Sequence, residues 1–209
     1  MAGYDLEIIK LLLLSKANIL LVGDPRQVTY HTHDESKYSK YKDGNIIAFI
    51  NTECKSISCE IDTESLNVSH RNNQIICEFS SKLFPNCFPC SSAQTKRTGH
   101  DGIFLVKEAD IEQYLYTYKP IQLRDSIRTV TNSNYMSINF GNSKGATFNR
   151  VLIYPTKPMF DWLKNHDSDL VAPSRAKFYV AITRAIYSVA IIMNYNDKTN
   201  IEGVQKFNF

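Results

Sequence analysis

The segment Tyr179-Val-Ala-Ile-Thr-Arg184-Ala places an arginine at the end of an apolar, helix-like run, just before the strand-like residues 187–193. A guanidinium is always charged, and its planar donors match phosphate oxygens when a rigid element holds it beside a sheet. Arg184 is therefore a candidate arginine finger, a side chain that stabilises charge on a transferring phosphoryl group. The alternative is a surface arginine at a helix end, where the helix dipole favours a cation.

Three further segments combine small residues with charged or amide side chains. Gly23-Asp24-Pro25-Arg26-Gln27 places a carboxylate and an amide after an apolar run, although a type I turn explains its backbone equally well. Ser69-His70-Arg71-Asn72 offers either a cation for a bound anion or a solvated turn. Gly141-Asn-Ser-Lys144-Gly145-Ala-Thr-Phe lets backbone N–H groups approach phosphate, although a tight turn between strands is the equal alternative.

The elements that must position these segments alternate between strand and helix patterns. Apolar periodicity predicts helices at 5–14, 74–83, 111–118, 160–164 and 176–184. Short apolar runs predict strands at 18–22, from Leu66, and at 102–106, 135–140, 151–154 and 189–193, while 31–42 is polar and 46–50 and 57–61 are ambiguous. This alternation predicts an α/β fold with a mostly parallel sheet and helices on both faces. The chemical segments are expected at the carboxyl ends of the strands, where such sheets bind ligands.

Composition sets limits on function without naming one. The 209 residues are 43% hydrophobic and 22% charged, with a net charge of +3, so any basic footprint for nucleic acid must be local. No apolar run is long enough for a membrane, and no secretory pattern is present. Five cysteines favour a reducing compartment, so the expected location is cytoplasmic. Their spacing lacks a clean second pair for zinc, and no metal site is expected.

The order of the four segments is more specific than any one of them. Residues 23–27, Leu66-Asn-Val-Ser-His-Arg71, Ser143-Lys-Gly145-Ala-Thr-Phe148 and 179–185 resemble motifs III, IV, V and VI of superfamily-one DNA helicases of the UvrD/Rep type. They occur in the family's order and cover nearly the whole chain. Within that family, residues 23–30 and Phe79-Ser-Ser-Lys-Leu-Phe-Pro85 look closest to the compact UvrD-like subunit of the Gabija anti-phage system.

The resemblance implies an ATP site in the cleft between two RecA-like domains of the P-loop NTPase type. By motif position, Gln27 would sense the γ-phosphate or the attacking water, and Arg71 and Arg184 would contact the γ-phosphate as catalytic residues. Lys144 and Gly145 would couple the nucleotide state to the DNA-binding surface. The ATP-binding residues would be Gly23, Asp24, Gln27, Arg71, Lys144, Gly145 and Arg184.

The resemblance also implies DNA contacts. Tyr30, just after motif III, would be a stacking platform for a base, and Ser143 of motif V would contact the strand. The tract Ser36-Lys37-Tyr-Ser-Lys40-Tyr-Lys interleaves cations and aromatics, which suits a phosphate backbone and its bases. A solvated lysine-rich loop has the same composition.

The chain lacks two motifs that such an enzyme needs. No Walker A sequence occurs, and Asp34-Glu35 follows no apolar strand. The resemblance therefore implies the C-terminal part of a helicase: residues 1–30 as a remnant of the first RecA-like domain, 31–65 as a linker, and 66–209 as the second RecA-like domain. The ligands for Mg²⁺ would lie outside this chain, on the missing N-terminal helicase half, and the chain alone is not expected to hydrolyse ATP.

Two functions follow from these observations. The leading one is the C-terminal module of an ATP-dependent DNA helicase or translocase that acts on single-stranded or duplex DNA. The alternative is a truncated or degenerate helicase domain that binds DNA or a protein, such as a partner nuclease, without catalysis.

Overall fold

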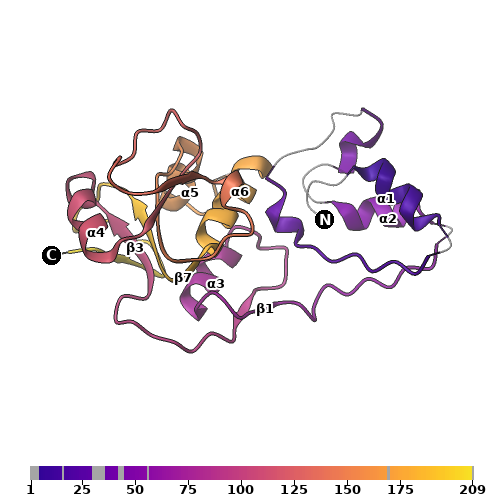
Figure 1. Cartoon of the computed structure of the whole chain (residues 1–209), viewed down its shortest axis with the longest axis horizontal. Helices are drawn as coiled ribbons and strands as arrows, with labels where there is room; N and C mark the ends of the chain where they lie inside the picture. Colours follow the sequence, from indigo (N-terminus) through magenta and orange to yellow (C-terminus); the bar gives the residue numbers. More distant parts are fainter. Residues whose placement is uncertain are drawn as a thin grey trace.

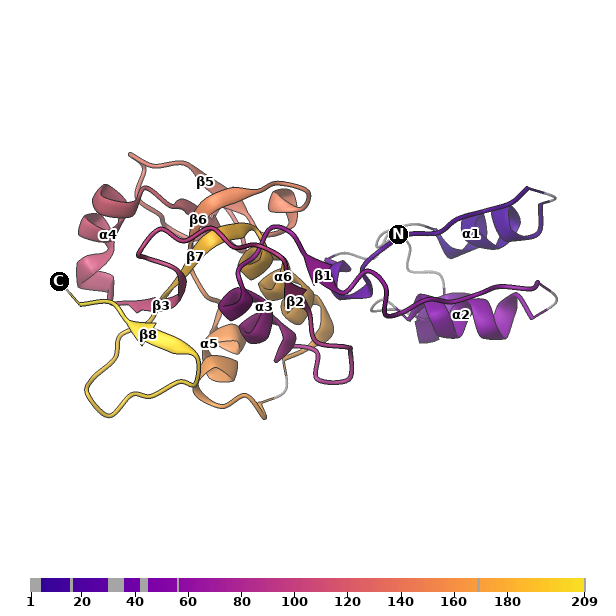
Figure 2. The same ribbon diagram turned by 90° about the horizontal axis from the view of Figure 1, so that it is seen from below.

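The computed structural model describes residues 5–15, 17–29, 36–41, 45–55, 57–168 and 170–208. An α/β body holds the larger, C-terminal part of the chain, and a small helical cluster holds the N-terminal part (Figure 1). Extended segments run between the two, so the cluster projects from one end of the body (Figures 1 and 2).

A six-stranded parallel sheet forms the centre of the α/β body. Its strands, in the order β5-β4-β6-β7-β3-β8, are Ser137–Asn139, Ile121–Arg124, Phe148–Ile153, Ala185–Ile192, Gly102–Val106 and Val204–Lys206. Every neighbouring pair of strands is parallel. All five residues of β3 are buried, as expected for a strand with both faces covered.

Helices cover both faces of this sheet, which confirms the predicted α/β class. On one face α3 (Gln74–Ser81), α5 (Lys157–Lys164) and α6 (Ala172–Thr183) pack Phe79, Trp162 and Phe178 against the strands. On the other face α4 (Ile111–Tyr118) contributes Tyr114 and Leu115. The main core therefore lies between β3, β6 and β7 and the first set of helices.

The N-terminal helical cluster has its own small core. It contains α1 (Leu6–Leu13), the 3-10 helix η2 (Ser36–Tyr41) and α2 (Ile46–Glu53), which resolves the ambiguous run at 46–50 as a helix. Phe49 is fully buried, and the rings of Tyr38 and Tyr41 each meet its ring edge-on at 5.3 Å. Aromatic packing therefore joins η2 to α2, and α1 adds the buried Ile9 to the same core.

The prediction of a buried strand at 18–22 is wrong. These residues have no regular structure, and the side chains of Leu20 and Val22 are 88% and 55% exposed. Within the described part of the chain these residues belong to no sheet, and a strand forms only as part of a paired ladder.

Several smaller elements complete the fold. The strand expected from Leu66 is only Val68–Ser69 (β1), which pairs with Ser91–Ser92 (β2) in a separate two-stranded ribbon. The 3-10 helices η1 (Pro25–Gln27), η3 (Glu108–Asp110) and η4 (Gly141–Ser143) lie in the connections. Among the described residues, no helix has the length and apolarity that crossing a membrane requires.

Candidate functional site

Arg184 is a buried cation at the junction of α6 and β7. It is the C-terminal cap of α6, and it is only 3% exposed. Its Nε donates to the carbonyl of Val180 at 3.1 Å, its Nη1 to the carbonyl of Ala146 at 3.3 Å, and its Nη2 to Oγ1 of Thr183 at 3.2 Å. The last turn of α6 and the segment before β6 thus hold the guanidinium in place.

These hydrogen-bond partners of Arg184 are all uncharged. Burial, followed by the nearby charge of Arg71, lowers the pKa of Arg184 to about 10, so it stays charged at neutral pH. The charge of Asp24 opposes this shift, but it is not hydrogen-bonded to Arg184 and burial outweighs it, so an arriving anion would offset part of the cost of the buried charge.

Two more cations lie near the turn that joins α6 to β7. Arg71, in the loop after β1, donates from Nη1 to the carbonyl of Thr183 at 3.1 Å. Lys144 is exposed, and its pKa is lowered first by partial burial and then by the charge of Arg184. Positive charges held near one another repel, and a bound anion relieves that repulsion. The cationic cluster of Arg71, Lys144 and Arg184 therefore favours an anion.

Asn72 braces the backbone on both sides of Arg184. Its Nδ2 donates to the carbonyls of Thr183 at 3.0 Å and Ala185 at 2.7 Å, and its side chain is buried. Its Oδ1 accepts a hydrogen bond from Oγ of Ser69 at 3.0 Å, which fixes the amide. The sequence reasoning did not single out Asn72, although it stands beside Arg71 in the same segment.

The segment 23–27 docks on α6 beside this cluster. Asp24 accepts from Nε of Arg26 at 2.8 Å and from Nε2 of Gln27 at 3.0 Å, while the guanidinium of Arg26 lies 5.0 Å from the ring centre of Tyr179. Burial opposes the charge on Asp24, but the hydrogen bonds from Arg26 and Gln27 outweigh it and lower the pKa of Asp24. Asp24 therefore orients Gln27, and Gly23 precedes it on the surface.

The loop that carries Lys144 depends on a glycine. Gly145 has a φ of +88°, in the left-handed region that L side chains rarely adopt. The neighbouring Ser143 is fully buried and donates from Oγ to the carbonyl of Phe140 at 2.7 Å. Its hydroxyl faces inward, an orientation that does not favour the DNA contact expected from motif V.

The cluster lies at the amino ends of the central strands, so the expectation of carboxyl ends is wrong. Phe148, the first residue of β6, pairs with Ala185, the first of β7, and its N–H donates to the carbonyl of Arg184 at 2.9 Å. The reason is the chain path: Arg184 precedes its strand, and residues 140–147 return from the end of β5 to the start of β6.

The candidate DNA contacts of the N-terminal part lie elsewhere, on or near η2. Lys37 pairs with Glu7 and Lys40 with Glu53, each at 3.4 Å, and both lysines are exposed. The interleaved Tyr38 and Tyr41 are 5% and 6% exposed, so their rings belong to the core of the cluster and offer no open face to a base. Tyr30 lies outside the described residues.

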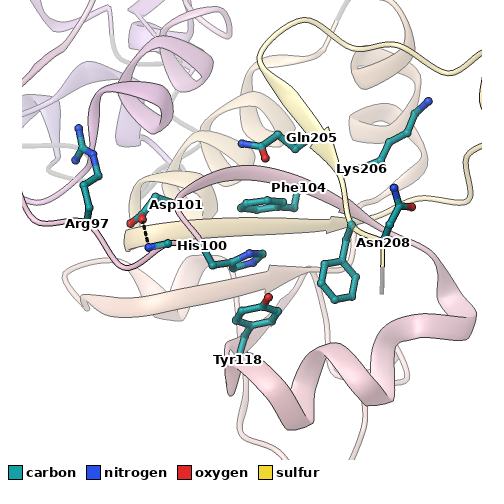
Figure 3. Close-up of a pocket in the computed structure, with 10 residues that line it drawn as sticks. Arg97, His100, Asp101, Phe104, Tyr118, Gln205, Lys206 and Asn208 are labelled. Atoms are coloured by element: carbon teal, nitrogen blue, oxygen red, sulfur yellow. Dashed lines mark hydrogen bonds between the residues drawn. The ribbon is translucent and has the colours of Figure 1, made fainter.

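An aromatic pocket lies beside β3 and β8 (Figure 3). The ring of His100 stacks between those of Phe104 and Tyr118, with centroid distances of 3.9 and 3.7 Å, and borders a cavity of about 490 Å³. Burial, followed by the charge of Arg150, lowers the pKa of His100 to about 4, and the ring is therefore neutral at pH 7. None of the residues predicted for the site lines this cavity.

The described residues contain no candidate metal site. Among them, no group of three or more His, Cys, Asp or Glu side chains is placed to hold a metal ion. The carboxylate of Asp24 acts electrostatically on Arg184 and Lys144, and it already accepts hydrogen bonds from Arg26 and Gln27.

Comparison with known proteins finds similarity in solved structures alone. No protein-family model and no curated protein sequence matches the chain. The chain resembles arterivirus nonstructural protein 10, a helicase, with a TM-score of 0.39 and 19% identity over 62% of this chain and 25% of that one. It also resembles the C-terminal domain of a possible DNA helicase from Lactobacillus plantarum WCFS1, with a TM-score of 0.42 and 12% identity over 66% and 98% of the two chains.

A third solved structure is the arterivirus helicase in complex with DNA. The TM-score is 0.39 and the identity 20%, over 61% of this chain and 25% of that chain. The present chain thus spans about a quarter of the length of the arterivirus helicase that it resembles.

Proposed function

We propose that this chain is the C-terminal module of an ATP-dependent DNA helicase or translocase, and that Arg184 and Arg71 contact the γ-phosphate of ATP. The observation that carries the proposal is the environment of Arg184. Its guanidinium is buried, its hydrogen-bond partners are neutral, Arg71 donates to the same turn, and the charge of Arg184 acts on Lys144. A polyphosphate is the anion that three converging cations suit, because it offers several charged oxygens over a short length.

The same arrangement suits phosphoryl transfer. Charge in that reaction spreads over the oxygens of the transferring group, and fixed donors stabilise it without reorganising. The brace of Asn72 holds the turn that carries Arg184, and Asp24 holds Gln27 beside it. In this proposal Gln27 orients the attacking water, while Arg26, packed on Tyr179, ties the segment 23–27 to α6.

The residues present fit the phosphate end of ATP but not its metal ion. Since the described residues hold no cluster of metal ligands, the Mg²⁺ carboxylates and the Walker A lysine would come from the N-terminal helicase half. Bound there, ATP would supply the γ-phosphoryl group that is transferred to water. Opening and closing of the cleft between two RecA-like domains would then step the protein along single-stranded or duplex DNA.

Finer parts of the proposal rest on the order of the sequence motifs. These parts are the assignment to the UvrD/Rep type and the similarity to the UvrD-like subunit of the Gabija anti-phage system. They also include a partner nuclease and a cytoplasmic location. Tyr30, Lys37 and Lys40 remain DNA contacts proposed from the sequence. So does Ser143, whose hydroxyl would have to leave the carbonyl of Phe140 to reach DNA.

DNA-stimulated ATP hydrolysis tests the proposal. This chain would be combined with a helicase half that carries Walker A and Walker B motifs, and phosphate release would be measured with and without single-stranded DNA. Removal of an arginine finger lowers phosphoryl transfer about 10³-fold or more, so Arg184→Ala should do the same. The exposed Arg128 supplies the matched control, because Arg128→Ala removes a cation from a different loop, the one between β4 and β5. A rate for Arg184→Ala within about twofold of the unmodified enzyme would refute the finger assignment.

Exposed apolar side chains favour a second candidate, a non-catalytic binding module. Leu11, Leu20 and Val22 of the N-terminal part are 63%, 88% and 55% exposed, and apolar side chains that form a contiguous exposed patch mark protein interaction sites. This candidate predicts binding of DNA or protein with no affinity for ATP. Parallel titrations with a fluorescent ATP analogue and with labelled single-stranded DNA separate the two functions.

A further inference from the structure

Two cysteines lie side by side behind the segment of Arg71 and Asn72. Cys77 belongs to α3, and Cys90 immediately precedes β2. Their Sγ atoms lie 3.7 and 3.4 Å from one shared acceptor, the carbonyl oxygen of Ser91. Sγ of Cys77 also lies 3.8 Å from the carbonyl oxygen of Asn72.

The backbones of the two cysteines are joined by a single hydroxyl. Oγ of Ser81 accepts from the N–H of Cys90 at 3.1 Å and donates to the carbonyl of Cys77 at 2.8 Å. The β1–β2 ribbon fixes the following residue, since Ser91 is paired with Val68. Contacts that do not involve the thiols therefore hold the pair in place.

The two thiols differ in access. Cys77 is 1% exposed, whereas Cys90 is partly exposed and is the more accessible residue of the two. The hydrogen bond from the Cys77 thiol, helped by the nearby Arg26 and opposed by burial, lowers the pKa of Cys90 to about 7. That same hydrogen bond, together with burial, raises the pKa of Cys77.

We propose that Cys77 and Cys90 form an oxidation site for hydroperoxides, in which Cys90 attacks the oxidant and Cys77 closes a disulfide. The Cys90 thiolate attacks the terminal OH oxygen of the hydroperoxide and the O–O bond breaks, which yields a sulfenic acid. The leaving group is hydroxide from hydrogen peroxide or alkoxide from an alkyl hydroperoxide. The Cys77 thiol then attacks that sulfur, the S–O bond breaks, and water leaves. In sum, two thiols lose two electrons and two protons, and one hydroperoxide is reduced.

The disulfide would tie α3 covalently to the start of β2. It would also replace the thiol contact to the carbonyl of Asn72, the residue whose side chain braces the backbone around Arg184. The oxidation site itself does not depend on the proposed helicase function.

Peptide mapping of the oxidised full chain tests the proposal. The protein is treated with hydrogen peroxide at neutral pH, quenched with an alkylating agent and digested without reductant. A peptide that links Cys77 to Cys90, lighter by two hydrogens than the sum of its parts, is expected. Cys59→Ser and Cys87→Ser remove the two exposed cysteines and serve as matched controls, so neither should slow formation of the link.

A second variant separates the two steps. In Cys77→Ser the sulfenic acid on Cys90 should persist and react with dimedone. In the unmodified protein at pH 7, Cys90 should be alkylated about fivefold faster than a free cysteine thiol of pKa about 8.5, because more of it is thiolate and its lower nucleophilicity offsets only part of that gain. A disulfide between Cys87 and Cys90, or oxidation of Cys59 and Cys87 as fast as Cys90 with no link to Cys77, would overturn the proposal. The mapping of the unmodified chain decides the matter even if Cys77→Ser does not fold.

Discussion

Acid should destabilise this protein through His100, and His100→Phe should remove that effect. His100 is 9% exposed, its ring lies between two aromatic rings, and its Nε2 lies 2.9 Å from the hydroxyl of Tyr114. Arg150 disfavours a proton there and Asp101 favours one, but burial dominates and lowers the pKa from 6.5 to about 4. Phenylalanine keeps a ring in the stack and cannot take up a proton.

The magnitude follows from the two pKa values. Because the unfolded chain binds a proton near pH 6.5 and the folded chain only near pH 4, stability is complete above pH 6.5 and falls as the pH drops towards 4. At about 1.4 kcal/mol per pH unit, the unfolding free energy would fall by about 2.5 kcal/mol between pH 7.5 and 4.5 from this residue. The adjoining cavity admits water, which makes that figure an upper value.

Urea unfolding at several pH values, followed by circular dichroism, measures this effect. The loss of stability between pH 7.5 and 4.5 should be larger in the unmodified protein than in His100→Phe, by roughly 1–2.5 kcal/mol. His166, whose pKa is also lowered by burial, is present in both proteins and cancels in the difference. Equal losses in the two proteins would refute the assignment of a neutral, buried His100.

Two further substitutions probe the frame of the site. Asn72→Ala should lower the unfolding free energy by about 2–4 kcal/mol in a urea titration, because the carbonyls of Thr183 and Ala185 lose the hydrogen bonds from its amide. Substitution of the exposed Asn134 by alanine is the control, and a loss below about 1 kcal/mol for Asn72→Ala would contradict the bracing role. Gly145→Ala should cost about 1–2 kcal/mol through backbone strain alone, since a Cβ there meets no atom within 4 Å; a gain in melting temperature would show that the left-handed conformation is not required.

The parts of the fold that sequence predicts well are those with strong local patterns. The apolar run of β3 (Gly102–Val106) and the periodic α4 (Ile111–Tyr118) match their predicted bounds. Strand β4 (Ile121–Arg124) escaped prediction because polar residues interrupt it. Its Gln122 is fully buried, and the carbonyls of Asn132 and Tyr135 satisfy its amide, which no local pattern reveals.

Contacts between residues far apart in the sequence limit the prediction of the candidate site in the same way. The chemistry of Arg71, Lys144 and Arg184 is readable from residue type and motif order, and the structure brings these three together with the segment of Gln27. Asn72 was missed because its partners are backbone carbonyls more than 100 residues away, at separations of 111 and 113. The run at 18–22 is the opposite case, in which a local pattern predicts an element that does not form. Its apolar pattern is typical of a strand, but a strand forms only where a neighbouring strand pairs with it.

The most direct test of the central claim is calorimetric titration of this chain with inorganic triphosphate. The unmodified protein should bind it, Arg184→Gln and Arg71→Gln should each weaken binding about tenfold or more, and Arg128→Gln should leave it unchanged. Circular dichroism would establish that each variant is folded. Binding that Arg184→Gln and Arg71→Gln leave intact, or that Arg128→Gln weakens equally, would contradict the claim that this cluster is a phosphate site.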